Sequence, residues 1–426
     1  MYKIILFLML VIVAKISSNA QVVNITEINY KSDPSTDASD WVELHNTTAT
    51  AINLSGWTLQ DADPMSALFV FPAAASLPAN GYAVVYRDII RFGSIHPGVG
   101  NTFGPMGFTF GKGGDTITLK NASGVQVAQV IYDNAVPWPK VAEGFGRTIE
   151  LKNPDATSGF NVGTNWQGSC MGGSPGLPPQ SCNDAIIYSE INYNSDTLYN
   201  HGEYVELFNT SAATINLTGW ALRDSRDTVT NVYYFPSGTL ITNNSRLVVS
   251  NDLVAFAAFH PTIANVVGPM PFSFSNGGEV IRLFDAAGVL RFSVYYNDTL
   301  AWTTDVDGTG KTLELVATTG NMNEGSNWKA GCILGSPGVA YDPLCPLGVN
   351  ELSLPELQLA STLITNELTI YNSNSNSIIS VVDVKGNVVH RQAAQGATTL
   401  NIDTAAWAQG LYIVHVTGFA MAKVVK

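Results

Sequence analysis

Glu27-Ile28-Asn29-Tyr30 and Trp41-Val42-Glu43-Leu44 decide the organisation of this chain, because both segments occur a second time. They return as Glu190-Ile191-Asn192-Tyr193 and Tyr204-Val205-Glu206-Leu207, in each case 163 residues further along. Self-similarity at a fixed offset identifies repeated structural units before any assignment of secondary structure. Two copies of one module therefore make up most of the chain.

The repeat continues to the end of each module. Ile-Asn-Leu-Ser-Gly-Trp at 52–57 matches Ile-Asn-Leu-Thr-Gly-Trp at 215–220, and the closing Asn-Trp pair at 165–166 matches that at 327–328. We place the first module at residues 21–182 and the second at 184–346, and each is long enough to fold alone. Residues 352–426 lie outside the repeat and predict a third, smaller domain.

Apolar residues alternate along the segments of each module. Val42 and Leu44 share one face of a strand while Trp41 and Glu43 share the other, which is the pattern of a half-buried β-strand. Other short segments of this kind, separated by Gly, Asn, Asp or Pro turns, lie at 83–86, 116–119 and 126–131. Many short strands with frequent turn signals predict an antiparallel β-sandwich.

The N-terminus has the pattern of an export signal. Lys3 precedes an apolar stretch from Ile4 to Ala14, and small residues end at Ala20 before Gln21. We interpret residues 1–20 as a removed signal peptide. The alternative is an uncleaved anchor, but the stretch falls short of the roughly 20 apolar residues that a spanning helix needs. After its removal we expect no transmembrane segment.

Charge narrows the class of partner. Only 13% of the 426 residues are charged, and the formal net charge is −13. Loss of the two lysines in the signal would make it −15. An acidic surface repels phosphate backbones, so nucleic acid is not the expected partner.

The four cysteines lie in two places, Cys170 with Cys182 and Cys332 with Cys345. Three pairings are open. We favour the local one, because each pair closes a short loop containing Gly-Ser-Pro-Gly, where a tight reversal can bring the sulfurs together. Free thiols or a metal site are the alternative, which an oxidising environment and the lack of nearby histidines disfavour.

Several carboxylates are retained in both copies and form the candidate metal site. If the first two strands pair, Glu27 and Glu43 project from one face, and clustered oxygens are the ligands that Ca²⁺ prefers. The favoured alternative is that these side chains are solvated or accept hydrogen bonds from turn amides. The candidate calcium ligands are Glu27, Glu43 and Asp61 in the first module and Glu190, Glu206 and Asp224 in the second.

No catalytic motif accompanies the other repeated polar or aromatic residues. His96 and His260 are the only histidines at matched positions, and no G-x-S-x-G motif occurs with them, so a turn or packing role is expected. The repeated tryptophans either fill the sandwich cores, which we favour, or stack on sugars. They are Trp57 and Trp220, Trp138 and Trp302, and Trp166 and Trp328.

The repeated motifs resemble those of the lamin tail domain. Glu-Ile-Asn-Tyr at 27–30, Trp-Val-Glu-Leu-His-Asn at 41–46 and Leu-Ser-Gly-Trp-Thr-Leu-Gln-Asp at 54–61 carry the resemblance, and the second copy fits equally well. The resemblance implies an immunoglobulin-like β-sandwich, found in nuclear lamins and in secreted bacterial proteins, and implies no activity by itself. The second copy departs from the first by Tyr204 for Trp41 and Phe208 for His45.

The C-terminal segment resembles the sorting domain of the type IX secretion system. The strand-like segments at 367–370, 381–389 and 400–402 and the Gly410-Leu411-Tyr412 strand before the terminal Lys426 carry this resemblance. The usual Pro-Asn-Pro opening is absent. The alternative is a third structural β-domain. The resemblance implies a small β-sandwich, contact with the secretion machinery, and a location outside a Gram-negative cell or on its surface.

The predicted fold is therefore all-β, with two tandem immunoglobulin-like sandwiches and a small sorting sandwich. We expect a secreted or surface-attached binding or adhesion protein that is not an enzyme and needs no cofactor, unless Ca²⁺ binds the repeated carboxylates. Its ligand, an extracellular protein or polysaccharide, is not identified by the sequence. The alternative is an accessory module of a secreted hydrolytic system, or a weak metal-dependent hydrolase.

Overall fold

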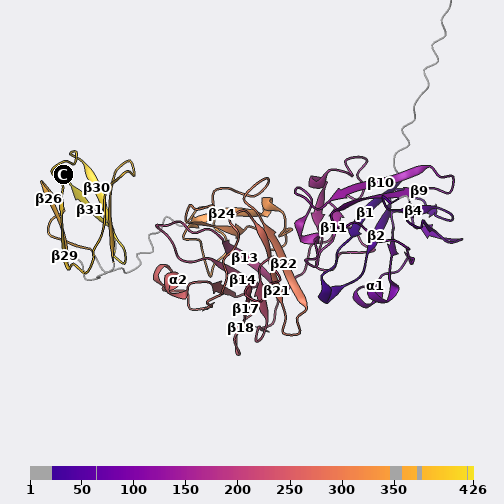
Figure 1. Ribbon diagram of the computed structural model, residues 1–426, viewed down its shortest axis with the longest axis horizontal. Helices are drawn as coiled ribbons and strands as arrows, with labels where there is room; N and C mark the ends of the chain where they lie inside the picture. The colour runs from indigo at the N-terminus through magenta and orange to yellow at the C-terminus, as the bar shows by residue number, and fades with distance from the viewer. Residues whose placement is uncertain (1–21, 64, 346–356, 372–376, 420) are drawn as a thin grey trace, which may run out of the picture. The chain divides into compact units, whose positions relative to one another are not determined.

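The computed structural model describes residues 22–63, 65–345, 357–371, 377–419 and 421–426. The predicted signal at 1–20 lies outside the described residues, as do the proposed domain boundaries at 346 and 352. The chain divides into two compact units after Tyr341 (Figure 1). The first unit contains both copies of the repeat, and the second contains the C-terminal strands.

The first module consists of two main antiparallel sheets, as the alternating pattern predicts. A six-stranded sheet has the order β12 (Trp166–Gly168), β11 (Ile149–Leu151), β1 (Val23–Asn29), β2 (Trp41–Asn46), β7 (Tyr82–Tyr86) and β8 (Thr102–Phe103). A four-stranded sheet has the order β10 (Gln126–Asp133), β9 (Gly114–Lys120), β4 (Thr58–Gln60) and β5 (Phe69–Val70). A two-stranded ribbon joins β3 (Ile52–Asn53) and β6 (Ser76–Leu77). Only the short pairing of β7 with β8 is parallel among these described strands.

The second module repeats this arrangement strand for strand. Its six-stranded sheet has the order β20 (Val266–Val267), β19 (Arg246–Ser250), β14 (Tyr204–Asn209), β13 (Ile186–Asn192), β23 (Lys311–Leu315) and β24 (Trp328–Ile333). Its four-stranded sheet has the order β17 (Val232–Tyr234), β16 (Ala221–Arg223), β21 (Glu279–Phe284) and β22 (Leu290–Tyr296). The ribbon joins β15 (Ile215–Asn216) and β18 (Leu240–Ile241).

Each module also has one short α-helix at a matched position. The helices are α1 (Ile89–Ile95) and α2 (Leu253–Phe259). An aspartate caps the N-terminus of each, Asp88 and Asp252, by accepting hydrogen bonds from two backbone amides of the first turn. Four single turns of 3-10 helix complete the modules, at Pro34–Thr36, Lys140–Ala142, Gly163–Asn165 and Gly325–Asn327.

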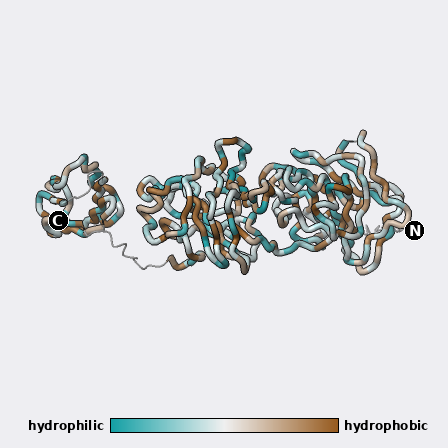
Figure 2. The backbone as a smooth tube through the Cα atoms, turned by 90° about the horizontal axis from the view of Figure 1, so that it is seen from below, coloured by the Kyte–Doolittle hydropathy of each residue, from teal (hydrophilic) through white to brown (hydrophobic). Residues whose placement is uncertain are grey.

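The apolar faces of the two sheets enclose one continuous core in each module. Strands that pass through these cores are strongly hydrophobic, while the connecting loops are more hydrophilic (Figure 2). Trp166 and Trp328 are 2% and 1% exposed, and Trp138 and Trp302 are also buried. These four tryptophans fill the cores, as we favoured over sugar stacking.

The C-terminal unit is a separate, smaller sandwich. One sheet has the order β25 (Gln358–Leu359), β26 (Glu367–Tyr371) and β29 (Thr399–Asp403). The other has the order β28 (Val388–Ala393), β27 (Ile378–Asp383), β30 (Leu411–Val416) and β31 (Ala422–Val425). Its core is its own, built from residues such as Leu368, Val381 and Val414. In the part of the chain that the structure describes, no helix is long and apolar enough to cross a membrane.

Candidate functional site

The retained glutamates form a row across three neighbouring strands. In the first module Glu27 on β1 lies opposite Glu43 on β2, as the sequence predicted, and opposite Glu150 on β11 on its other side. All three side chains are buried. Glu150 was not among the predicted residues, although its equivalent in the second module, Glu314, stands in a matching strand and was a usable signal.

In the first module this row holds the loop that closes the module. The backbone amide of Ser174 donates to Glu27 Oε1 over 3.0 Å, and that of Gly176 donates to Glu43 Oε2 over 2.6 Å. The Ser174 hydroxyl donates to Glu150. Three carboxyl groups therefore fix one turn of backbone, residues 173–176, which we call the closing loop.

The second module has the same set of hydrogen bonds between its own glutamate row and its closing loop, and we call this set the latch. Ser336 donates from its amide to Glu190 Oε1 over 3.0 Å and from its hydroxyl to Glu314 Oε2 over 2.6 Å. The amide of Gly338 donates to Glu206. The closing loop of the second module is thus residues 335–338, and it has the same Gly-Ser-Pro-Gly sequence.

A β-bulge supplies a further donor to each row. The register of β1 against β2 shifts at Thr26, and its hydroxyl donates to Glu43 Oε1 over 2.6 Å. In the second module the bulge falls at Ser189, whose hydroxyl donates to Glu206 Oε1 over 2.6 Å. A bulge changes the direction of a side chain locally, and in both copies it turns a hydroxyl toward a glutamate of the row.

Burial controls the ionisation of the rows. It raises the pKa of Glu43 to about 8 and that of Glu206 to about 7. Burial also raises the pKa values of Glu27 and Glu190 well above the usual range, and the neighbouring glutamates raise them further. The rows therefore keep protons near neutral pH, which lets them accept and donate hydrogen bonds with little repulsion.

The other two predicted metal ligands lie elsewhere. Asp61 follows β4 and accepts hydrogen bonds from the Asp63 amide and the Ser66 hydroxyl, whereas Asp224 follows β16 and pairs with Arg226 over 2.6 Å. The structure does not bring them to the glutamate rows. Within the described residues, no group of three or more His, Cys, Asp or Glu side chains is arranged to hold a metal ion. Calcium binding at the six carboxylates stays the less favoured of our two sequence predictions.

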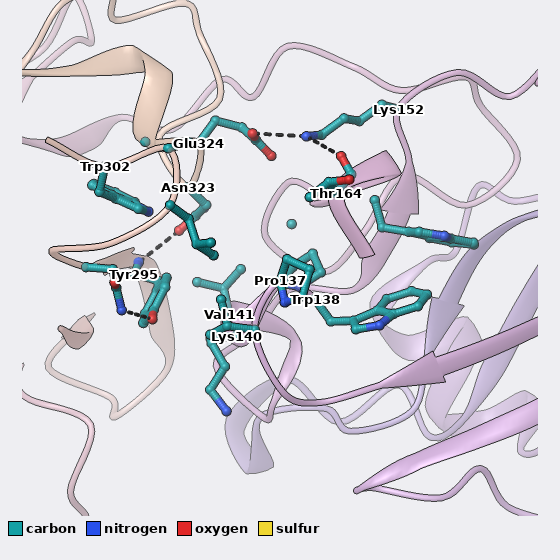
Figure 3. Close-up of a pocket in the computed structure, with 18 residues that line it drawn as sticks. Pro137, Trp138, Lys140, Val141, Lys152, Thr164, Tyr295, Trp302, Asn323 and Glu324 are labelled. Atoms are coloured by element: carbon teal, nitrogen blue, oxygen red, sulfur yellow. Dashed lines mark hydrogen bonds and ion pairs between the residues drawn. The ribbon is translucent and has the colours of Figure 1, made fainter. Parts of the chain in front are cut away.

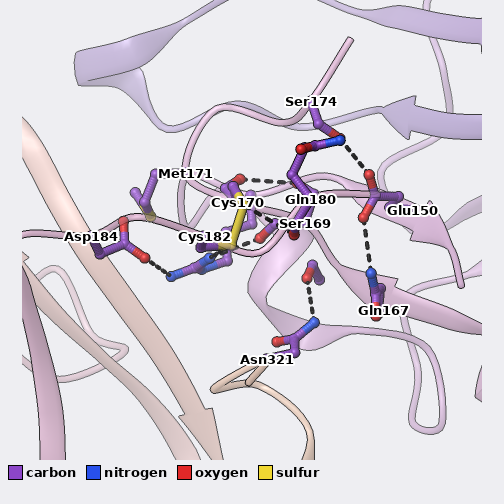
Figure 4. The surroundings of a disulfide bond; sticks show 12 residues. Glu150, Gln167, Ser169, Cys170, Met171, Ser174, Gln180, Cys182, Asp184 and Asn321 are labelled. Carbon is purple, nitrogen blue, oxygen red and sulfur yellow. Dashed lines mark hydrogen bonds and ion pairs between the residues drawn. A yellow bond between two sulfur atoms is a disulfide. The ribbon is translucent and has the colours of Figure 1, made fainter. Parts of the chain in front are cut away.

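Both pairs of cysteines form disulfides. Cys170 is bonded to Cys182, with 5.2 Å between their Cα atoms (Figure 4). Cys332 and Cys345 are disulfide-bonded as well, and they are the two remaining cysteines of the chain. The local pairing is therefore correct, and each bridge encloses a closing loop.

A buried arginine joins the two modules beside the first disulfide. Arg147 is 3% exposed, and its guanidinium donates to the carbonyls of Ser169 in its own module and Ser293 in the other, over 2.8 and 3.1 Å. Asp184 lies 3.8 Å from the same guanidinium. The Asn321 side chain adds a bond of 2.9 Å to the Gly168 carbonyl (Figure 4). No pattern in the amino-acid sequence indicated this junction.

A cleft of about 210 Å³ opens at the junction of the modules. Lys152 of the first module and Glu324 of the second form an ion pair of 3.0 Å on its rim (Figure 3). Val136 and Leu300, at matched positions of the repeat, are 43% and 70% exposed beside it. The rest of its apolar lining includes Pro137, Trp138, Val141, Trp166, Ala301 and Trp302.

The matched histidines have the packing role that we expected. His96 and His260 end α1 and α2, where the backbone amide of each donates to the carbonyl of a helix phenylalanine. The His96 ring packs edge-on against Trp41, with 5.8 Å between ring centroids. Burial lowers the pKa of both rings to about 4, so they are neutral at pH 7.

Comparisons with known families agree with the repeat. Residues 16–134 and 179–298 match the family model described as Lamin Tail Domain. Residues 364–426 match the model described as Secretion system C-terminal sorting domain. The two lamin tail matches together cover more than half of the chain. No curated protein matches the chain.

Solved structures show only distant likeness. A DUF4876 family protein from Bacteroides thetaiotaomicron is 10% identical, with 71% of this chain and 94% of that chain covered and a TM-score of 0.24. A biofilm associated protein, BSP domain, is 10% identical over 95% of this chain and 80% of its own, with a TM-score of 0.16. PorZ, a surface component of the type-IX secretion system of Porphyromonas gingivalis, is 8% identical over 95% and 51%, also at 0.16. Likeness at this level carries no functional argument.

Proposed function

The chain belongs to the lamin tail domain family and ends in a secretion sorting domain, and on that premise we propose that it is an extracellular binding protein. The sorting domain marks it for secretion or display on the surface of a Gram-negative cell and implies contact with the secretion machinery. Lamin tail modules are non-catalytic in kind, so activity must be argued from a site rather than from the fold. The finer proposal is that the paired modules hold an extracellular protein or polysaccharide.

The cleft between the modules is the observation that carries this proposal. Its lining is mostly apolar, and Val136 and Leu300 remain exposed beside it. Concave apolar sites with a few polar groups are the usual ligand sites of proteins. The Lys152–Glu324 ion pair supplies such polar groups on the rim. We therefore assign the ligand to this cleft.

The buried contacts at the junction favour a preformed site. Arg147 is bonded to both modules, and Asn321 adds a second bond between them. A site that is ordered before binding loses less conformational entropy when the ligand arrives. The two modules therefore present one surface instead of two independent ones.

The groups that an enzyme would need have other roles in the described residues. The glutamates of both rows accept hydrogen bonds from the closing loops, and the matched histidines pack against aromatic rings. No observation of comparable strength supports the hydrolase alternative or the accessory role in hydrolysis. Binding is accordingly the function that we propose.

The proposal is tested by attachment of the full chain to surfaces coated with individual polysaccharides and extracellular proteins. We expect saturable attachment to at least one coating. The double variant Val136→Glu, Leu300→Glu should lose most of it, because two charges would have to be desolvated in the cleft. Val229→Glu is the matched control, since Val229 is 94% exposed and does not line the cleft.

Two results would contradict the proposal at different levels. If the intact chain attaches to none of the coatings, the binding function itself is wrong. If it attaches but the double variant attaches equally well, binding occurs elsewhere and the assignment to the cleft is wrong. Thermal unfolding of each variant verifies that a loss of attachment is not a loss of folding.

A further inference from the structure

A groove of about 820 Å³ is lined by residues of both modules and is distinct from the apolar cleft. Its second-module wall is the face of the four-stranded sheet that points away from the core, with Arg223 on β16, Tyr234 on β17 and Phe284 on β21. Its first-module wall contains Lys31, which follows β1, and Lys112, which precedes β9. None of these residues lines the cleft, so the groove is a second concave surface.

Arg223 is positioned in this groove without an acceptor for its guanidinium. Its Cζ atom lies 5.4 Å from the centre of the Phe284 ring, and stacking on an aromatic face orients the planar guanidinium. The Nε atom is buried and has no hydrogen-bond partner among the described residues. Because a buried donor that lacks an acceptor is costly, above all on a charged group, an anion from outside the chain would satisfy it.

The carboxylates of the groove have partners, whereas three of its cations do not. Asp33 is buried and accepts hydrogen bonds from the amide and hydroxyl of Ser35. The other three carboxylates of the lining form the ion pairs Glu143–Lys140, Asp227–Arg282 and Asp285–Arg291. Within the described part of the chain, the side chains of Arg223, Lys31 and Lys112 form no ion pair or hydrogen bond. The free charge of the groove is therefore positive, in a chain whose formal net charge is −13.

An exposed aromatic ring beside these cations indicates the class of anion. Tyr234 is 60% exposed, and an amphipathic ring of this kind offers a flat apolar face together with a polar tip. An acidic peptide would use the cations but not this ring, and a nucleic-acid backbone would be repelled by the acidic remainder of the surface. We infer that the groove binds an acidic polysaccharide, with a carboxylate of the sugar chain on Arg223 and a sugar ring stacked on Tyr234.

The first module does not carry this set of residues on its equivalent face. Gln60 stands at the position of Arg223, Val70 at that of Tyr234 and Lys120 at that of Phe284. Lys120 donates to the Gln60 side chain over 3.3 Å, so the cation of this face has an acceptor within the chain. The repeat therefore predicts one such site per chain, in the groove beside the second module.

The test is calorimetric titration of the full chain with polygalacturonate at pH 7, beside its uncharged methyl ester. We expect binding of polygalacturonate that weakens as salt is added, and much weaker binding of the ester. Arg223→Gln should weaken binding by about tenfold, the loss expected for a charge-assisted pair. Tyr234→Ala and Lys112→Gln should each weaken it by roughly threefold.

Two matched controls remove one cation each outside the groove. Lys152→Gln lies on the rim of the apolar cleft and Lys120→Gln on the equivalent face of the first module, and both should bind as the unaltered chain does. Equal losses in these controls would mean that the polymer is attracted by charge in general, and a loss confined to Lys152→Gln would place it in the cleft. Either result overturns the inference.

The inference also fails if the unaltered chain does not bind polygalacturonate, or binds its methyl ester equally well. Tighter binding of polyglutamate or single-stranded DNA would show that the class of ligand is wrong. Thermal unfolding verifies that each variant is folded, and Lys112→Gln tests the groove from its opposite, exposed wall if Arg223→Gln is unstable. Unchanged affinity in the folded variants of both walls would place the polymer elsewhere. Each of these failures leaves the proposed function of the cleft intact, because uncharged coatings test the cleft alone.

Discussion

Raising the pH from 6.5 to 8 is expected to remove more stability through Glu43 of the first module than through its equivalent, Glu206, of the second. The cause is a single difference beside the glutamate rows. In the second module Arg246 on β19 lies 3.0 Å from Glu206 and lowers the pKa of that carboxyl against the effect of burial. The same position of the first module, on β7, is Tyr82, so Glu43 has no such counter-charge there.

The magnitude follows from the two pKa values. A glutamate whose pKa is raised in the folded state contributes stability that is complete below its unfolded value, near 4.5, and is lost as the pH rises through the folded value. The free energy of unfolding falls by about 1.4 kcal/mol for each pH unit over which the folded state holds one more proton than the unfolded state. With a pKa of about 8, the contribution of Glu43 to the free energy of unfolding falls by about 2 kcal/mol between pH 6.5 and 8. With a pKa of about 7, the contribution of Glu206 falls by less than about 1 kcal/mol over the same range.

The window begins at pH 6.5 because the buried histidines act in the opposite direction below it. Burial lowers the pKa of His96 and His260 from 6.5 to about 4, so the unfolded chain binds more protons there and stability rises with pH until 6.5. Above pH 6.5 the glutamates contribute more than these histidines to the pH dependence of stability.

The assay is denaturant unfolding of the full chain at pH 6.5 and at pH 8, compared with Glu43→Gln and Glu206→Gln. Glutamine reproduces the protonated acid, so Glu43→Gln should abolish about 2 kcal/mol of the pH dependence and Glu206→Gln a smaller part. Equal pH dependence in the unaltered chain and in Glu43→Gln would refute the reasoning. A larger effect of Glu206→Gln than of Glu43→Gln would refute the role given to Arg246.

Three other outcomes are expected. Arg147→Met should weaken the junction by about 3–5 kcal/mol, because Asp184 loses its buried counter-charge. Calorimetry should then resolve separate unfolding transitions for the two modules, whereas one shared transition is expected for the unaltered chain. A single unshifted transition in the variant would contradict this. Reduction of the Cys170–Cys182 bridge should cost about 3 kcal/mol, measured as a lower midpoint of unfolding, and an unchanged midpoint would show that the latch alone holds the closing loop. Millimolar Ca²⁺ should leave the unfolding temperature as it is with EDTA, because protein donors already occupy the glutamate rows, whereas a rise that is lost when the glutamates become glutamines would establish a metal site.

Local pattern was sufficient to predict the strands and part of the glutamate row. Alternation along β1 and β2 placed Glu27 and Glu43 on one face, and the structure pairs them directly. The same reasoning could not find Glu150, because periodicity defines the face of a strand but not which distant strand lies beside it. The partner strand β11 begins only at Ile149, and its position depends on the packing of the whole module.

Retention in both copies was a weaker guide than periodicity. Asp61 and Asp224 are retained as faithfully as the glutamates, but each accepts a hydrogen bond from the amide two residues later, which is the chemistry of a turn. A carboxylate that caps a turn and a carboxylate in a buried row can be retained equally well at matched positions of the two copies. Only the strand or loop around each residue distinguishes the two roles.

The two copies differ along the sheet face by which the second module contacts the first. Along the sheet face that lines the junction, the second module carries Ala221, Arg223, Arg282 and Phe284, where the first carries Thr58, Gln60, Thr118 and Lys120. In the first module these polar side chains bond along the face, from Lys120 to Gln60 over 3.3 Å and from Gln129 to Thr118 over 3.1 Å. Because the first module bonds these polar side chains to one another, its face differs in chemistry from the face by which the second module forms the junction.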